Sequence, residues 1–220
     1  MASSSAPTKF TALSTAGKLL EVNMNDVGIL LPQDRVRTSI GTQRLNGCTA
    51  IVVLGQAIII AHIAPLPPGS STTRPPSVTA GDRHFNQMMD DVQTLLMINR
   101  AYFPPRTTAW GIFGKFEGSS MKEKEDITTQ RFAALGLTSR HIYYNVQLAQ
   151  TRTKAAAGEV AVVRNDQVAA LYVEDEVKMT VDFTKGVTQA PAVASSSASG
   201  GTSSTASSAA GNDEYWAYST

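Results

Sequence analysis

One cysteine and one histidine are the residues of this chain best suited to covalent chemistry. Cys48 is the only cysteine among 220 residues, and it directly follows Gly47 at the start of an apolar run. A thiol becomes a nucleophile when a base takes its proton and nearby backbone N–H groups hold the developing oxyanion. A glycine beside the thiol lets a substrate approach the backbone closely. We therefore predict a nucleophile at Cys48, oxyanion contacts at Gly47 and Cys48, and a base at His62, 14 residues later.

These two side chains lie on the two arms of a predicted β-hairpin. Two apolar, β-branched runs, 49–54 and 57–63, flank Gly55-Gln56, which is typical of a two-residue turn. In that register Cys48 and His62 point to opposite faces of the sheet, because successive side chains alternate. A one-residue bulge near the open end would bring them to one face, with Cβ atoms roughly 5–8 Å apart. We therefore expect a bulge if the two residues act together.

The alternative is that both residues are ordinary core side chains. A lone cysteine beside a strand commonly packs as a small hydrophobic group, and a lone histidine in an apolar run is commonly a core residue. The chain has no second cysteine and no pair of histidines at ligand spacing. We therefore predict neither a zinc site nor any other cofactor.

The elements that would position this hairpin alternate between strands and helices. Apolar residues recur every three or four positions over 85–101, which predicts an amphipathic helix, and a second helix is predicted over 122–135, closed by Gly136. The other predicted strands are 18–24, 27–31, 107–113, 141–146, 160–163 and 168–173. Strands on both sides of two helices predict the α+β class, an α/β sandwich of β-sheets with two packed helices.

Composition divides the chain into a domain and two terminal segments. We expect a flexible N-terminus over 1–12, one domain over 13–186 and a disordered tail rich in Ser and Ala over 187–220, with 66–81 as a long surface loop. The tail ends in acidic and aromatic residues that either bind a partner through a short motif or have no partner: Asp213, Glu214, Tyr215, Trp216 and Tyr218.

Charge and cysteine content exclude several classes of protein. A formal net charge of +1 argues against nucleic acid as a partner, since phosphate binding needs a basic excess. The longest apolar stretch, Ala57–Ala64, is far shorter than the roughly 20 residues of a membrane helix, so no membrane partner is expected. One unpaired thiol and a polar N-terminus without a secretory signal predict a cytoplasmic or nuclear location.

The residues around the cysteine also resemble a known family. Leu45-Asn46-Gly47-Cys48-Thr49 resembles the Leu-x-Gly-Cys signature of the protein glutamine deamidases that include the bacterial chemoreceptor deamidase CheD and the catalytic domain of the cytotoxic necrotizing factors. The resemblance implies that Cys48 is the nucleophile and His62 the base. It also implies that Thr42, six residues before the cysteine, orients the histidine as the third member of a triad.

The resemblance covers about residues 20–175 and implies a CheD-like deamidase fold, since Pro65, the two helices and the strands follow in the same order. The chain departs from the family at Gly114-Lys115-Phe116-Glu117-Gly118 and at the start of the second helix, Asp126-Ile-Thr-Thr-Gln. It implies deamidation of a glutamine in a protein substrate. The alternatives are a catalytically silent interaction module of the same fold and acyl transfer to an amine, as in a transglutaminase.

Overall fold

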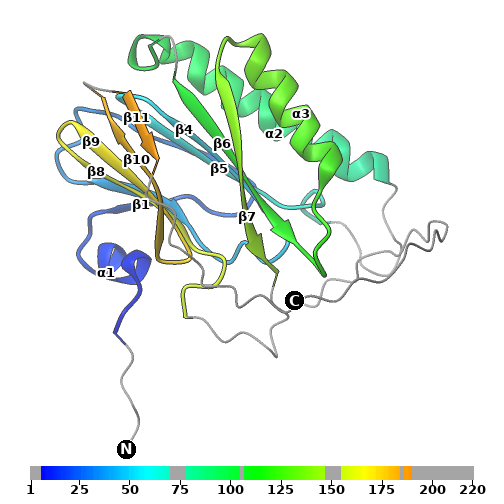
Figure 1. Cartoon of the computed structure of the whole chain (residues 1–220), viewed down its shortest axis with the longest axis horizontal. Helices are drawn as coiled ribbons and strands as arrows, with labels where there is room; N and C mark the ends of the chain where they lie inside the picture. Colours follow the sequence, from blue (N-terminus) through cyan, green and yellow to red (C-terminus); the bar gives the residue numbers. More distant parts are fainter. Residues whose placement is uncertain (1–5, 70–77, 105–106, 147–154, 184–185, 190–220) are drawn as a thin grey trace, which may run out of the picture.

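The computed structural model describes residues 6–69, 78–104, 107–146, 155–183 and 186–189. Over these residues the chain forms two β-sheets packed face to face and three α-helices (Figure 1). The α+β class predicted from the sequence is therefore confirmed. The apolar side chains between the two sheets form one core cluster, and those between one sheet and its helices form another.

The five-stranded sheet carries the predicted hairpin at its centre. Its strands, in spatial order, are β2 (Asp26–Leu30), β5 (Ile58–Ile63), β4 (Thr49–Leu54), β6 (Thr108–Lys115) and β7 (Thr138–Asn145). Every residue of β4 and β5 is buried, because one face of these strands packs against the other sheet and the opposite face packs against helices. This explains why both arms of the hairpin are continuously apolar rather than alternating.

Two helices cover the outer face of this sheet (Figure 1). They are α2 (Val78–Ile98), followed by the short 3₁₀ helix η1 (Arg100–Tyr102), and α3 (Lys122–Ala134). The chain leaves α3 through Gly136 at φ +71°, as the sequence predicts. Helix α2 begins earlier than predicted, inside the expected 66–81 loop. A Cβ on Gly81 would lie 2.7 Å from the carbonyl oxygen of Pro65, so this glycine lets the helix start pack against the preceding segment.

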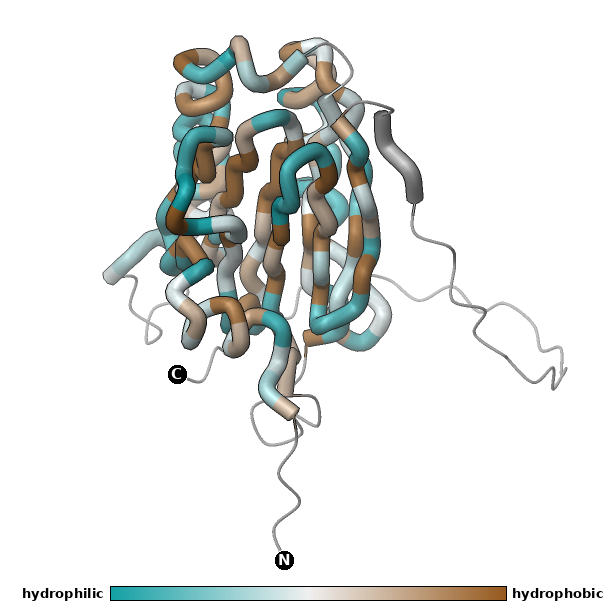
Figure 2. The backbone as a smooth tube through the Cα atoms, turned by 90° about the vertical axis from the view of Figure 1, so that its left-hand side faces the viewer, coloured by the Kyte–Doolittle hydropathy of each residue, from teal (hydrophilic) through white to brown (hydrophobic). Residues whose placement is uncertain are grey.

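The six-stranded sheet lies across the core from the hairpin, and hydrophobic residues are concentrated along the strands of both sheets (Figure 2). Its strands, in spatial order, are β1 (Leu19–Glu21), β3 (Ser39–Thr42), β8 (Val160–Asn165), β9 (Val168–Val173), β10 (Glu176–Asp182) and β11 (Gly186–Gln189). Strands β8 and β9 were both predicted and pair with each other, whereas β3 and β10 were missed. Strand β3 is short and includes Gly41, which weakens its strand signal.

Helix and strand structure extends past both expected ends of the domain. Helix α1 (Lys9–Thr15) lies in the expected flexible N-terminus, and its Phe10 is buried and would contact a Cβ on Gly41, so packing on the sheet orders this segment. Strand β11 extends into the expected tail and pairs with β10. The acidic and aromatic cluster at 213–218 lies outside the described residues. No helix in the described part of the chain is long and apolar enough to cross a membrane.

Candidate functional site

The turn of the β4–β5 hairpin sets the geometry of the site. Leu54 pairs with Ile58, so three residues form the turn, and the Gly55 N–H donates to the Ala57 carbonyl at 2.9 Å. The Gln56 N–H donates to the Tyr102 carbonyl, and a Cβ on Gly55 would lie 2.5 Å from the same oxygen. Packing against η1 therefore favours a longer turn than the sequence alone indicates.

The added turn residue shifts the pairing by one position and places Cys48 and His62 on one face. His62 pairs with Ala50, and the β4–β5 pairing contains no bulge. Directly paired residues share a face, and Cys48 precedes Ala50 by two positions, so all three side chains face the interior between the sheets. Cys48 and His62 thus occupy diagonal positions, typically about 7–8 Å apart between Cα atoms. The turn replaces the expected bulge.

Thr42 reaches His62 from the opposite sheet. The Thr42 Oγ1 lies 2.6 Å from His62 Nδ1, and both residues are buried, at 0% and 2% exposed. Thr42 is the last residue of β3. A threonine hydroxyl can donate or accept. When His62 Nδ1–H donates to Thr42, the other ring nitrogen, Nε2, carries the lone pair that a general base needs.

The Cys48 thiol and the His62 ring are not hydrogen-bonded in this structure. Among the described residues, buried His62 Nε2 has no hydrogen-bond partner. Cys48 is also only 5% exposed. The reason is that Cys48 immediately precedes β4 and packs within the core between the sheets. Nε2 is therefore available to accept a proton but has to approach the sulfur first.

Burial keeps both groups neutral. It raises the pKa of the Cys48 thiol to about 11, and the positive charge of Lys124 acts in the opposite direction. Burial lowers the pKa of His62 to about 4. At neutral pH the pair is therefore a thiol and an imidazole, not a thiolate and an imidazolium.

A tight turn before β4 fixes the backbone of the cysteine. The Cys48 N–H donates to the Leu45 carbonyl at 2.6 Å, and Gly47 has φ +82°, a conformation that glycine adopts at little cost. The Tyr144 hydroxyl lies 2.7 Å from the Cys48 carbonyl oxygen and also contacts that of Leu45. Of the two predicted oxyanion donors, Cys48 N–H is thus already engaged, whereas Gly47 N–H has no acceptor among the described residues.

Asn25 and His84, which the sequence did not indicate as site residues, also lie at this end of the sheet. The Asn25 N–H donates to the His62 carbonyl at 2.7 Å, and its side-chain oxygen accepts from Ala64 N–H at 3.0 Å. His84 Nε2 lies 2.8 Å from the same oxygen. Asn25 has φ +63°, and asparagine tolerates this conformation better than most residues, which is the sequence signal that could have marked it.

Lys124 lies in the first turn of α3, close enough to influence the Cys48 thiol. Its ammonium group lies 5.7 Å from the centre of the Phe85 ring. The helix is held on the sheet by buried Glu125, which accepts from the Tyr143 hydroxyl at 3.1 Å, with His141 Nδ1 at 3.8 Å. These contacts fix the cationic side chain near the cysteine.

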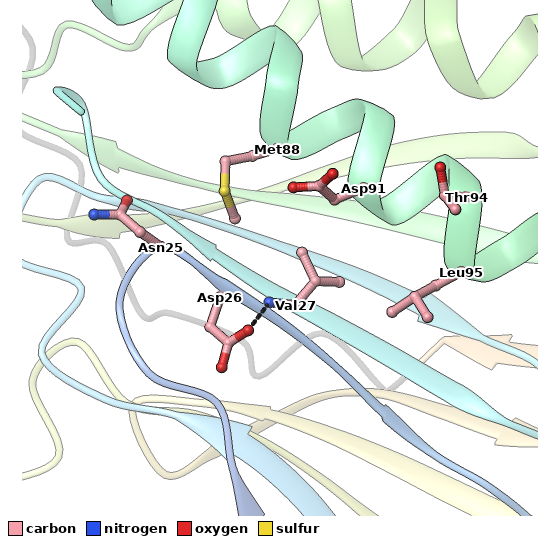
Figure 3. A pocket seen from close by; sticks show the side chains of 7 residues that line it. All are labelled: Asn25, Asp26, Val27, Met88, Asp91, Thr94 and Leu95. Atoms are coloured by element: carbon pink, nitrogen blue, oxygen red, sulfur yellow. Dashed lines mark hydrogen bonds between the residues drawn. The ribbon is translucent and has the colours of Figure 1, made fainter. Parts of the chain in front are cut away.

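A pocket and a groove lie near this end of the sheet. A pocket of about 170 Å³ adjoins Gly47 and is lined further by Gly114, Phe116, Ser119, Ser120, Met121 and Val146. An open groove of about 340 Å³ begins at Asn25 and follows β2 and α2 (Figure 3). Neither the pocket nor the groove has Cys48 or His62 in its lining. The pocket adjoins the residue before Cys48, whereas the groove lies at β2, two strands from β4.

Comparison of the chain with protein-family models and with curated proteins found no match.

Proposed function

We propose that this chain is a cysteine-dependent amidohydrolase that converts a glutamine side chain of a protein substrate to glutamate. Cys48 is the nucleophile, His62 the general base and acid, and Thr42 the residue that orients the histidine. The observation that carries the proposal is the 2.6 Å contact from Thr42 Oγ1 to His62 Nδ1, on the sheet face shared with Cys48. A CheD-like fold is part of the same proposal, supported by the order of strands and helices.

In the first half of the reaction, the sulfur of Cys48 attacks the carboxamide carbon while its proton moves to His62 Nε2. The carbonyl π electrons move to oxygen, and the Gly47 N–H is the backbone donor available to stabilise this oxyanion. The tetrahedral intermediate collapses, the C–N bond breaks, and the imidazolium returns its proton to the nitrogen. Ammonia leaves and a thioester remains on the cysteine.

In the second half, water attacks the thioester while His62 Nε2 accepts one of its protons. The carbon–sulfur bond breaks, the sulfur regains a proton from the imidazolium, and the substrate carries a carboxylic acid. One water is consumed and one ammonia released per glutamine. The neutral resting pair fits this sequence, because the proton moves during attack rather than before substrate binds.

Mass spectrometry of glutamine-containing peptides tests the proposal directly. Soluble protein from cells that express the wild-type chain is compared with protein from cells that express Cys48→Ser. Conversion of an amide to an acid adds about one dalton, and we expect glutamines that gain this mass only with the wild type. Ser14→Ala, an exposed substitution in α1, is the matched control and should behave as wild type. Modification that persists with Cys48→Ser would exclude this nucleophile.

The catalytically silent interaction module is the second candidate. The observations that favour it are the low exposure of Cys48 and the absence of a hydrogen bond at His62 Nε2 among the described residues. In that case no glutamine changes mass with any variant. Transfer to an amine is distinguished in the same experiment by adding a primary amine of known mass, which would replace the acid product by the amine adduct.

A further inference from the structure

The groove of about 340 Å³ lies along one edge of the five-stranded sheet, between β2 and α2 (Figure 3). It begins at Asn25, whose N–H donates to the His62 carbonyl. The strand order β2-β5-β4 places this end of the groove two strands from the start of β4, where Cys48 lies. Cys48 lies on the side of the sheet that faces the other sheet, and the groove lies on the side covered by helices, so a polypeptide has to pass over this end of the sheet to reach both.

Strand β2 forms one wall of the groove and is an edge strand. It pairs with β5 on one side, and it is the last strand of its sheet within the described part of the chain. An edge strand can add an extended segment of another protein through main-chain hydrogen bonds. In β2 the Val27 N–H is taken by the Asp26 carboxylate at 2.8 Å, a local contact that an incoming strand could replace (Figure 3).

The floor of the groove is apolar. Val27 of β2 and Met88 and Leu95 of α2 line it, and all three belong to or pack against the core cluster beneath the helices. Ile98 is three residues beyond Leu95 on the same helix and is 75% exposed. This arrangement suits an apolar side chain at every second position of an extended segment.

The rim of the groove is negatively charged. Asp26 and Asp91 are both exposed, and no Lys or Arg in the described ranges forms an ion pair with either. Asp91 has only a 3.4 Å contact from Gln87, whereas its neighbour Asp90 is paired with Arg131. Two carboxylates without an ion pair, one on β2 and one on α2, give the groove a negative potential that attracts a cationic ligand.

We propose that the groove binds an extended segment of the protein substrate in which basic residues alternate with apolar ones. The segment pairs with the free edge of β2, its apolar side chains contact Val27 and Leu95, and its Lys or Arg side chains reach Asp26 and Asp91. This inference rests on the proposed function, because the occupant is the substrate that carries the reacting glutamine. It adds the chemistry by which that substrate is recognised.

Binding of synthetic peptides to the full chain tests the inference without requiring catalysis. The probe is a fluorescein-labelled eight-residue peptide that alternates Val and Lys, and the comparison peptide has Glu in place of Lys. Fluorescence anisotropy should detect binding of the Lys peptide to wild type and Cys48→Ser alike, weakened by salt. Asp26→Asn and Asp91→Asn should each weaken it about threefold or more. Asp166→Asn, which removes the same charge at the β8–β9 turn, should have no effect. Amide NMR signals of β2 should shift on titration with the Lys peptide.

Several results would overturn the inference. They are equal binding of the Lys and Glu peptides, binding unaffected by the Asp26 and Asp91 substitutions, and a dimer in sedimentation that occupies β2 and excludes the peptide. Binding of the Lys peptide without any glutamine modification would reject the proposed function and leave the groove as a docking surface. Glutamine modification without binding of the Lys peptide would support the proposed function and reject the groove as the surface that binds the substrate.

Discussion

The hydroxyl of Thr42 lies 2.6 Å from Nδ1 of His62 and so links the two sheets at the end of their shared core. Thr42 ends β3 of the six-stranded sheet, and His62 is in β5 of the five-stranded sheet. A histidine held at one nitrogen has a defined ring orientation, which leaves the other nitrogen for proton transfer. The packing of the two sheets is therefore coupled to the proposed chemistry.

Removal of the Thr42 hydroxyl should reduce turnover more than substrate binding. We expect Thr42→Val to lower kcat by about 10–100-fold with little change in KM, because the ring loses its fixed orientation. Thr42→Ser keeps the hydroxyl and should retain most of the activity. The measurement is ammonia release from a substrate identified by mass spectrometry. Full activity in Thr42→Val would remove Thr42 from the proposed triad.

His62 should make the fold sensitive to acid. Its pKa is lowered to about 4 by burial, so the folded state favours the neutral ring. Its contribution to stability is therefore fully present above the unfolded pKa of about 6.5 and is lost as the pH falls toward 4. A shift of this size corresponds to about 3 kcal/mol across that window.

The test is chemical denaturation of wild type and His62→Gln between pH 7 and pH 4. We expect the free energy of unfolding to fall more steeply with acid in the wild type than in His62→Gln, which has no titrating ring. His84→Gln is the control histidine variant, since burial also lowers the pKa of His84 but its ring is only half-buried. Parallel pH profiles for wild type and His62→Gln would show that the ring does not titrate as burial predicts.

The thiol of Cys48 should react slowly with iodoacetamide and only at high pH. With its pKa raised to about 11, the thiolate population at neutral pH is about 300-fold smaller than for an ordinary thiol with a pKa of about 8.5. Lys124→Met removes the positive charge that opposes this shift, so it should move the labelling profile to still higher pH, while Lys124→Arg should restore it. Lys122→Met, at an exposed lysine paired with Asp126, is the control.

The rate of labelling is measured against pH for each variant, with the unfolded chain as the reference for an ordinary thiol. A profile for the folded chain centred well below pH 8.5 would mean that a thiolate and imidazolium pair exists before substrate binds. That result would contradict the neutral resting state argued from burial.

The sequence was sufficient to predict the elements with strong periodic signals. Helix α2, the hairpin and strands β8 and β9 follow from apolar patterning, α3 was predicted with Gly136 at its end, and the types of these elements are confirmed. The N-terminal helix was missed because its stability comes from burial of Phe10 against a distant sheet, a contact that no local pattern records. Strand β3 was missed for a similar reason, since its four residues are stabilised by pairing with β1 and β8.

At the candidate site, the length of the hairpin turn predicted from the sequence is wrong by one residue. The sequence places Gly55-Gln56 in a two-residue turn, whereas contacts with Tyr102 produce a turn of three. Because side chains alternate along a strand, this single residue decides whether Cys48 and His62 share a face. Asn25 was missed because its contacts with His62 and His84 join segments far apart in the sequence.

Tyr144 should hold the cysteine in position through the backbone. Its hydroxyl lies 2.7 Å from the Cys48 carbonyl oxygen, and the side chain is buried in the core between the sheets. Tyr144→Phe leaves a buried carbonyl with one contact fewer, which should cost about 1–3 kcal/mol of unfolding free energy. It should also lower kcat more than it changes KM, because the turn that presents the sulfur loosens.

Tyr172→Phe is the matched control for this prediction. Tyr172 lies in β9 of the other sheet, its hydroxyl makes no hydrogen bond among the described residues, and its ring contacts Lys9. Denaturation and ammonia release are measured for both variants and the wild type. If Tyr144→Phe loses stability but keeps the wild-type kcat, Tyr144 supports the fold alone. If Tyr172→Phe lowers kcat equally, the effect does not come from the contact with Cys48, because the control variant leaves that contact in place.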